Sequence, residues 1–554
     1  MDDRAGKAAH GRSVAALLAI AIAYSLFAAY AVMYGRAWTD EATYVVKSWW
    51  YVNGLIEPYS DQDATWYMPL FFYQLGFIEK LFGTSLAVGR IMSATIGGLS
   101  GGLLFLICRR LTGSPATAAF AVLLYLLTPT TAYYFATAAP LATVAFLLLL
   151  AVWLILIGME RPRVWISAAL GLLFWALFFY RQNMILAIGL LAPAYILVLG
   201  QRRWLHAGIV IGVALVAGAG LLLVFPAKLG FYALRIPGLV SILGELNLLP
   251  LNLRLIQQGT DSSALLNLNL SSVTWQDFAI SFLLPFLGTI VLALSSFWVA
   301  RKYLLIFPVA FFSLAITHFI GSTGYCSTCV LMYANYFVGI GAIAAALALV
   351  ALWRLCIARA WPALPITLLV AIAAVGSNAL GSLIPVSADP NPYRLFPEPM
   401  LHQYGAMREV LEIDQFAQVI AASTPPDKPV LVLHTQPALP YAVFRAGRQV
   451  AVQSLNIRQS FRRIRPDLGP AERTAVLRAV AAESLWSHET LQHWLDEGFD
   501  TVVLQEGSGI AEYPSAAVLD ANFDLRTRAV FLGWNIAVYV RRSTPAVDEP
   551  AASP

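Results

Sequence analysis

Two adjacent carboxylates, Asp40 and Glu41, follow the first long apolar run of the chain, residues 13–34. This run carries no charged residue and is long enough to cross a bilayer, which takes about 20 residues. Acids at its end do not help it to insert. A carboxylate at the boundary between lipid and water can instead serve as a general base. The pair is therefore the first candidate for chemistry.

Two arginines stand at comparable positions. Arg90 opens the second apolar run, and Arg181 lies between the fifth and sixth runs, followed by Gln182 and Asn183. Arginine is suited to bidentate contacts with phosphate. The carboxylate could deprotonate an acceptor hydroxyl, and the arginines could stabilise a departing phosphate. This combination predicts transfer of a sugar from a lipid phosphate.

The composition indicates a polytopic membrane protein. Of the 554 residues, 59% are hydrophobic and 12% are charged, and the mean hydropathy is +0.69. Soluble domains usually carry about 25% charged residues. The net charge of +5 is modest, and no basic tract alternates with aromatic residues. We therefore expect no nucleic acid partner.

About eleven apolar runs are long enough for tilted or slightly short membrane helices. They cover residues 13–34, 86–107, 115–132, 138–158, 164–180, 183–200, 206–225, 278–299, 303–320, 331–352 and 362–385. Arginines and lysines gather at every second junction, which by the positive-inside rule faces the cytoplasm. The first run exceeds the apolar part of a signal peptide, so we interpret it as a retained helix. This topology predicts a cytoplasmic amino terminus and an outer carboxyl-terminal domain. The Ala- and Arg-rich composition and the short cytoplasmic turns indicate a bacterial inner membrane.

The longer loops, residues 35–85 and 226–277, are then on the outer side. The segments 42–52 and 69–82 of the first loop predict helices that lie on the membrane surface. In the second loop, Lys228, Arg235 and Arg254 either bind lipid phosphate or anchor an interfacial helix. Further candidates for substrate contacts are Tyr67 in the first loop, Gln182 and Asn183 beside Arg181, and His318 near the outer end of the ninth run.

The composition changes after the last apolar run. We expect a transmembrane module over residues 1–385, a proline-rich linker over 386–399, an α/β domain over 400–543 and a disordered tail over 544–554. Strands are predicted near 429–433, 449–453, 501–504 and 534–540, and helices over 471–486 and 489–497. Cys326 and Cys329 could form a disulfide, remain free thiols, act in redox chemistry or contribute to a zinc site.

Several motifs resemble the GT-C membrane glycosyltransferases, above all the bacterial relatives of protein O-mannosyltransferases and lipid A aminoarabinose transferases. The motifs are Thr39–Tyr44, Pro69–Leu70 with Lys80–Gly83, Gly89–Ser93, and the basic residue Arg181. Two positions depart from the family pattern. Met68 stands where many relatives have Lys or His, and Tyr333-Ala334-Asn335-Tyr336 stands near the place of an Arg-Tyr pair.

The resemblance implies the GT-C fold, a donor class and a catalytic base. It implies a polyprenyl-phosphate sugar donor, work on the extracytoplasmic face, inversion at the anomeric carbon, and Asp40 as the base. We expect the acceptor to be a glycan, lipid or protein hydroxyl. No cofactor is required, since arginines supply positive charge, although the two acids leave weak binding of a divalent metal open.

Each candidate also has an interpretation without catalysis. Asp40 can cap a helix that begins near Ala42. Glu41 can be a supporting acid, a metal ligand or a solvated group, and Arg90 can anchor its helix at the headgroups. A flippase for lipid-linked saccharides and a non-catalytic scaffold are the rival functions. The first needs charges along a through-cavity, and the second does not need clustered acids and arginines.

Overall fold

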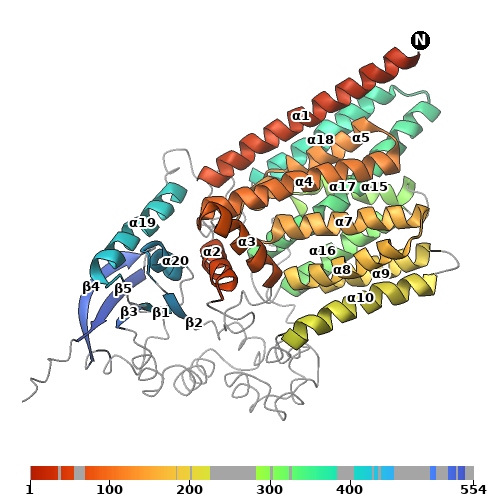
Figure 1. Ribbon diagram of the computed structural model, residues 1–554. Helices are drawn as coiled ribbons and strands as arrows, with labels where there is room; N and C mark the ends of the chain where they lie inside the picture. Colours follow the sequence, from red (N-terminus) through yellow and green to blue (C-terminus); the bar gives the residue numbers. More distant parts are fainter. Residues whose placement is uncertain are drawn as a thin grey trace, which may run out of the picture. The chain divides into compact units, whose positions relative to one another are not determined.

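The computed structural model of this chain contains helices and a sheet (Figure 1). The described residues are 2–34, 39–54, 69–181, 184–199, 203–224, 282–299, 304–322, 327–383, 405–426, 430–434, 438–448, 450–454, 500–506, 519, 522–531 and 534–542. They fall into two compact units, which divide between Met407 and Arg408.

The first unit is helical, with long helices running side by side (Figure 1). Its helices are α1 (Asp2–Tyr34), α2 (Thr39–Val52), α3 (Pro69–Phe82), α4 (Leu86–Thr112), α5 (Pro115–Leu126), α6 (Pro129–Phe135), α7 (Leu141–Glu160), α8 (Val164–Tyr180), α9 (Ile185–Val198), α10 (Arg203–Val224), α15 (Leu287–Val299), α16 (Ile306–Ser322), α17 (Ser327–Ala358) and α18 (Ala363–Leu383). All eleven predicted apolar runs fall on these helices.

Six described helices, α1, α4, α7, α10, α17 and α18, are long and apolar enough to cross a membrane individually. The predicted third run is a bent pair, α5 and α6, with an angle of 69° between them. The bend follows from Pro129, because proline lacks an N–H and disfavours helical backbone at the preceding residue. Four further apolar helices, α8, α9, α15 and α16, are shorter. The number of true spans remains a prediction.

Small residues let the helices approach closely, as is typical of membrane bundles. A side chain at Gly288 of α15 would overlap the backbone of Ala374 in α18, and one at Gly381 would overlap the carbonyl of Leu284. Buried Asn378 adds hydrogen bonds at the same contact. Its Oδ1 accepts from the Gly288 N–H at 2.9 Å, and its Nδ2 donates to the Thr289 hydroxyl at 2.9 Å.

The predicted surface segments of the first outer loop are both helical. The helices α2 and α3 pack together, and Gly76 of α3 touches the carbonyl of Ser48 so closely that no side chain fits there. Tyr44 packs against Phe71 and Phe72 with ring centroids about 6 Å apart. Neither helix is among the candidate spans. Their position at the membrane surface remains a prediction.

The second unit contains a five-stranded sheet with the order β2-β1-β3-β5-β4. Its elements are α19 (Gly405–Ser423), β1 (Val430–His434), α20 (Ala438–Arg445), β2 (Val450–Ser454), β3 (Thr501–Gln505), β4 (Phe523–Phe531) and β5 (Trp534–Arg541). β1 pairs in parallel with β2 and β3, whereas β5 is antiparallel to β3 and β4. Every residue of the central strand β3 is buried.

All four predicted strands are present within one residue of their expected bounds, and the mixed α/β class is confirmed. The edge strand β4 was not predicted. Asp524, Arg526 and Arg528 are exposed, and they alternate with the less polar residues at 523, 525, 527 and 529. This period of two is a strand signal that the sequence carries. Charged edge strands of this kind resist pairing with other chains. The linker at 386–399 and the predicted helices at 471–486 and 489–497 lie outside the described residues.

Candidate functional site

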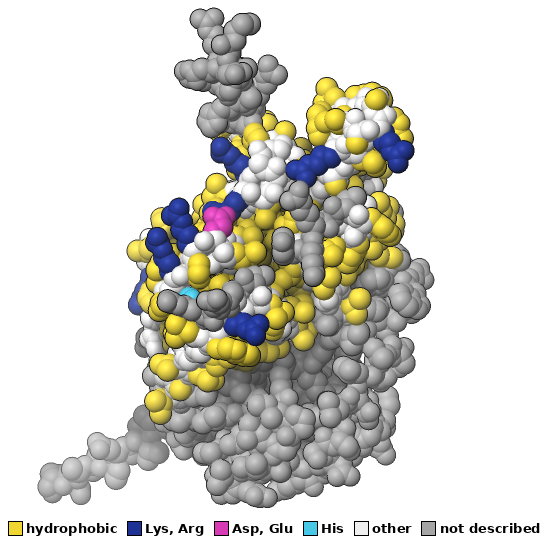
Figure 2. All heavy atoms as spheres, turned by 90° about the vertical axis from the view of Figure 1, so that its right-hand side faces the viewer, with side chains coloured by type: hydrophobic (Ala, Val, Ile, Leu, Met, Phe, Trp, Pro, Cys, Tyr) yellow, Lys and Arg dark blue, Asp and Glu magenta, His cyan; other side chains and the backbone are white. Residues whose placement is uncertain are grey.

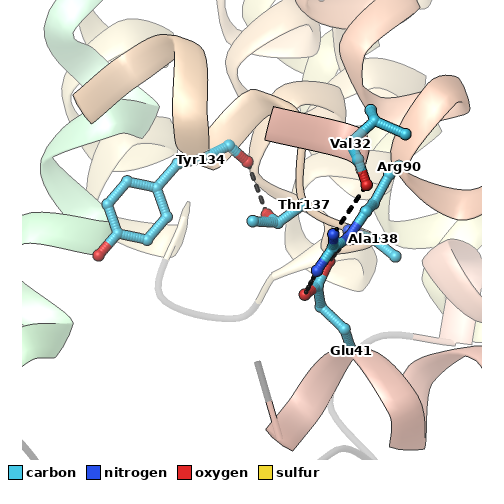
Figure 3. A network of polar contacts seen from close by, with 6 residues as sticks. All are labelled: Val32, Glu41, Arg90, Tyr134, Thr137 and Ala138. Atoms are coloured by element: carbon cyan, nitrogen blue, oxygen red, sulfur yellow. Dashed lines mark hydrogen bonds and ion pairs between the residues drawn. The ribbon is translucent and has the colours of Figure 1, made fainter. Parts of the chain in front are cut away.

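Glu41 and Arg90 form a buried, bidentate ion pair (Figure 3). Arg90 Nε donates to Glu41 Oε1 at 3.0 Å, and Arg90 Nη2 donates to Glu41 Oε2 at 2.8 Å. The exposed fraction is 0% for Glu41 and 4% for Arg90. A planar guanidinium matches a carboxylate in this two-bond arrangement, which fixes both the distance and the orientation of the partners.

Two backbone groups extend this pair into a network. The Ala138 N–H donates to Glu41 Oε1 at 2.6 Å, and Arg90 Nη1 donates to the Val32 carbonyl at 3.0 Å. Val32 lies near the end of α1, Arg90 near the start of α4, and Ala138 in the turn between α6 and α7. The network therefore ties the first turns of α2 to three other segments.

The sequence reason for this convergence is local. Ser85 caps α4 through a hydrogen bond from the Val88 N–H, which places Arg90 in the second turn. Gly89 has to be small, because a Cβ there would lie 2.7 Å from the Ala138 side chain. The turn before α7 thus packs directly on α4 beside Arg90, where its N–H reaches Glu41.

Asp40 precedes Glu41 on α2, and its backbone is helical. The helix begins at Thr39, earlier than the predicted start near Ala42, so Asp40 lies in the first turn rather than at the capping position. Its side chain is outside the described part of the structure. The anchored neighbour Glu41 nevertheless fixes the position of the Asp40 backbone relative to α1, α4 and the turn before α7.

Arg181 lies at the end of α8, where its N–H closes the helix on the Leu177 carbonyl at 2.9 Å. Its Nη2 donates to the Tyr333 hydroxyl at 3.2 Å, and its guanidinium lies 5.4 Å from the centre of the Tyr333 ring. Tyr333 in turn stacks on Tyr336, with ring centroids 5.8 Å apart. A cation beside two tyrosine rings on α17 is thus held by both a hydrogen bond and a cation–π contact.

The predicted site residues therefore form pairs that the sequence did not predict. Arg90 pairs with Glu41, while Arg181 pairs with Tyr333. The phosphate-binding role of both arginines remains a prediction, although the geometry of Arg90 favours a positioning role. Tyr67, Gln182, Asn183, Lys228, Arg235 and Arg254 lie outside the described residues. For His318 only the backbone, in α16, is described.

Tyr333 and the Ala138 turn were not predicted as parts of the site. The sequence offered a signal for Tyr333, since an Arg-Tyr pair was missing from the later spans. In the structure, Arg181 at the end of α8 and Tyr333 of α17 form an arginine–tyrosine pair. Nothing in the sequence could predict Ala138, because its contribution is a backbone N–H.

Glu79 of α3 is a second buried acid in the first outer loop. It is 1% exposed, and neither carboxyl oxygen has a hydrogen-bond partner among the described residues. Burial raises the pKa of Glu79 to about 9, because removal from water disfavours the charged form. At neutral pH the carboxyl is therefore protonated and uncharged.

Within the described residues, no three His, Cys, Asp or Glu side chains gather into a group able to hold a metal ion. The absence of a metal requirement remains a prediction. Cys108 of α4 and Cys356 of α17 are buried free thiols. Cys326 and the side chain of Cys329 lie outside the described part of the chain.

Residues 63–228 match the family model of dolichyl-phosphate-mannose-protein mannosyltransferases. No curated protein matches the sequence. The structure is similar to ArnT from Cupriavidus metallidurans bound to undecaprenyl phosphate, with a TM-score of 0.53 and 14% identity, over 96% of this chain and 98% of that chain. Its similarity to the apo state of ArnT has a TM-score of 0.53 and 16% identity, with the same coverage.

These findings agree on two points. The structural likeness extends over nearly the whole chain and confirms the predicted fold class, an ArnT-like GT-C bundle with a carboxyl-terminal α/β region. The family match covers α3 to α10 and confirms the predicted class of enzyme. The family match supports neither of the rival functions, a flippase or a scaffold.

Proposed function

We propose that this chain, a GT-C membrane glycosyltransferase by its fold and family match, transfers a sugar from a polyprenyl-phosphate donor to a hydroxyl acceptor. The transfer takes place on the extracytoplasmic face, with Asp40 as the general base. The acceptor is a glycan, a lipid or a protein. The donor class is supported by the undecaprenyl phosphate bound to ArnT in the structure that this chain resembles.

The observation that carries the proposal is the buried network around Glu41, one residue after Asp40. At that carboxylate α2 meets α4 and the turn before α7, and Arg90 links it further to the end of α1. Fixed placement of a reacting group within a few tenths of an ångström is a major part of enzymatic rate acceleration. Glu41 and Arg90 are therefore positioning residues, and they hold the start of α2 where Asp40 meets the acceptor.

In the proposed reaction, Asp40 takes the proton of the acceptor hydroxyl as the acceptor oxygen attacks the anomeric carbon of the sugar. The bond between that carbon and the phosphate oxygen breaks, and the electron pair leaves with the polyprenyl phosphate. A single displacement of this kind inverts the anomeric centre. The proton passes to water when the product departs.

Arg181 stabilises the departing phosphate. A guanidinium carries five N–H donors in a planar fork that matches the oxygens of a phosphate. Charge that develops on the leaving oxygen is stabilised by a donor that is already in place. Tyr333 and Tyr336 hold the guanidinium, so that phosphate binding does not require Arg181 to become ordered.

The proposal is tested with purified protein and radiolabelled polyprenyl-phosphate sugars, offered with membrane extracts as a source of acceptor. Wild-type protein should release polyprenyl phosphate and label a product. Asp40→Asn should retain donor binding but lose transfer by about 100-fold or more, the range for a general base. Glu160→Gln, a change at an exposed acid paired with Arg110, is the matched control.

Full transfer by a folded Asp40→Asn protein would overturn the assignment of the base. Failure of the wild-type protein with every polyprenyl-phosphate sugar, together with movement of lipid-linked saccharide across vesicles, would favour a flippase instead.

A further inference from the structure

A groove of about 900 Å³ runs between α5, α17 and α18. It is lined by residues from 116–123 of α5, 349–354 of α17 and 364–376 of α18. Thr112, which ends α4, lies beside it, while Arg90 lies near the other end of the same helix. At 1.5 Å per residue the two are about 33 Å apart, so the groove is separate from the Glu41 network.

The groove is apolar along most of its length. Phe120 of α5 and Val375 of α18 pack at its base against a buried cluster that includes Leu124 and Ala345. Its α18 side carries leucine and isoleucine that remain exposed, at 55% for Leu368 and 61% for Ile372. Exposed apolar side chains on a membrane helix face the acyl chains of lipids. The volume is at the upper end of the range for small-molecule pockets.

Polar groups gather at one end of this groove. Arg354 of α17 lines it together with Thr112, Ser114 and Thr117, where α4 ends and α5 begins. The hydroxyls satisfy each other and the backbone: Ser114 Oγ accepts from both the Thr117 N–H and its hydroxyl. Among the described residues, no hydrogen bond or ion pair engages Arg354. By contrast, Arg110 pairs with Glu160 and lies over the Trp153 ring.

The surrounding surface has the same sign of charge. Figure 2 shows this end of the helix bundle, where basic side chains lie at several places and acidic side chains of described residues at one. A basic group at the mouth of an apolar groove between membrane helices matches a lipid with an anionic headgroup, because the phosphate and the acyl chains are recognised together.

We propose that the groove between α5, α17 and α18 binds a glycerophospholipid with an anionic headgroup. The acyl chains lie along Phe120, Leu368 and Ile372, and the phosphate lies at Arg354. The proposal does not depend on the transferase reaction, since it concerns the opposite end of α4.

Native mass spectrometry of the purified full-length chain tests the headgroup. It is titrated with phosphatidylglycerol and phosphatidylcholine of identical acyl chains. Arg354→Gln should weaken phosphatidylglycerol binding about fivefold, which corresponds to about 1 kcal/mol for one basic residue near a lipid phosphate. Phosphatidylcholine binding should change little. Arg359→Gln, directly after the end of α17 and outside the groove, should leave both affinities unchanged.

The position is tested by filling the groove and by quenching. Leu368→Trp should weaken binding of both lipids. Trp353 lines the groove, so phosphatidylglycerol with brominated acyl chains should quench its fluorescence. The Trp353→Phe variant should lack this quenched component. Equal phosphatidylglycerol affinity in wild type and Arg354→Gln would overturn the proposal. An equal loss of phosphatidylglycerol affinity in Arg359→Gln would overturn it too. So would a groove that binds undecaprenyl phosphate and no glycerophospholipid.

Discussion

Arg181 and Tyr333 are 152 residues apart in sequence, and the Arg181 guanidinium donates to the Tyr333 hydroxyl at 3.2 Å. The two side chains come from the end of α8 and the early part of α17. The same guanidinium stands over the Tyr333 ring. This relationship brings an arginine from α8 to a tyrosine of α17, whose own sequence has no arginine near Tyr333.

We expect Arg181→Gln to raise the KM for the donor and to lower kcat, because the charge that meets the phosphate is lost. Tyr333→Phe keeps the ring and removes only the hydroxyl. It should therefore have a much smaller effect, up to about tenfold, consistent with loss of one hydrogen bond. Steady-state kinetics with a fixed acceptor measure both variants. Equal losses in the two variants would contradict a direct role of the Arg181 charge.

The Glu41–Arg90 pair predicts strong coupling in stability. Either Glu41→Gln or Arg90→Gln leaves a buried charge without its partner, which costs about 3–5 kcal/mol. The double variant should be less destabilised than the sum of the two, because no lone charge remains. Thermal unfolding in detergent gives the comparison. Additive losses would show that the pair is not energetically linked.

Glu79 predicts a pH-dependent stability. The native pKa of about 9 lies above the ordinary value of 4.5, so the native state holds the proton more tightly than the unfolded state. Its contribution to the free energy of unfolding is complete below about pH 4.5 and is lost as pH rises through about 9. The total loss is on the order of 6 kcal/mol. The melting temperature of wild type should therefore fall between pH 5 and pH 9.

Glu79→Gln removes the titrating group and should flatten that dependence. Because its amide stays neutral, the variant should be more stable than wild type at pH 9. Glu160→Gln changes an exposed acid and serves as the control. If the slope against pH is the same in wild type and Glu79→Gln, the carboxyl does not titrate in this range.

Asn378 predicts a specific loss of helix packing. Its side chain contacts Gly288 and Thr289 of α15, and also donates to the Thr128 hydroxyl at 3.2 Å. Asn378→Leu should lower the melting temperature, since donors and acceptors on two neighbouring segments lose their partner, at a cost of about 1–3 kcal/mol. Ser377→Ala removes a hydroxyl that bonds within its own helix and should have little effect.

Removal of divalent metal should leave the transfer activity unchanged, because Arg181 can supply the charge that meets the phosphate. The measurement is transfer after dialysis against EDTA, with and without added Mg²⁺ or Mn²⁺. A loss of activity that metal restores would require a metal-binding role for acids such as Asp40.

The sequence by itself determined the helices, the strands and the chemical class. Long uncharged runs have to be helical in a membrane, since every backbone polar group there needs an internal partner. Short buried strands such as β1 and β3 are predicted equally well from their continuous apolar residues. The motif order from Asp40 to Arg181 was enough to predict the enzyme class, which the comparisons confirm.

Only the tertiary structure decided how the charged residues are paired. Glu41 and Arg90 were predicted as separate functional groups, and the fold buries them against each other with the Ala138 N–H. Arg181 lies beside Tyr333 because α8 and α17 approach in space. Pairing depends on which helix faces meet, and local composition and periodicity do not specify that. For the same reason, the sequence could not predict that Glu79 is buried without a partner.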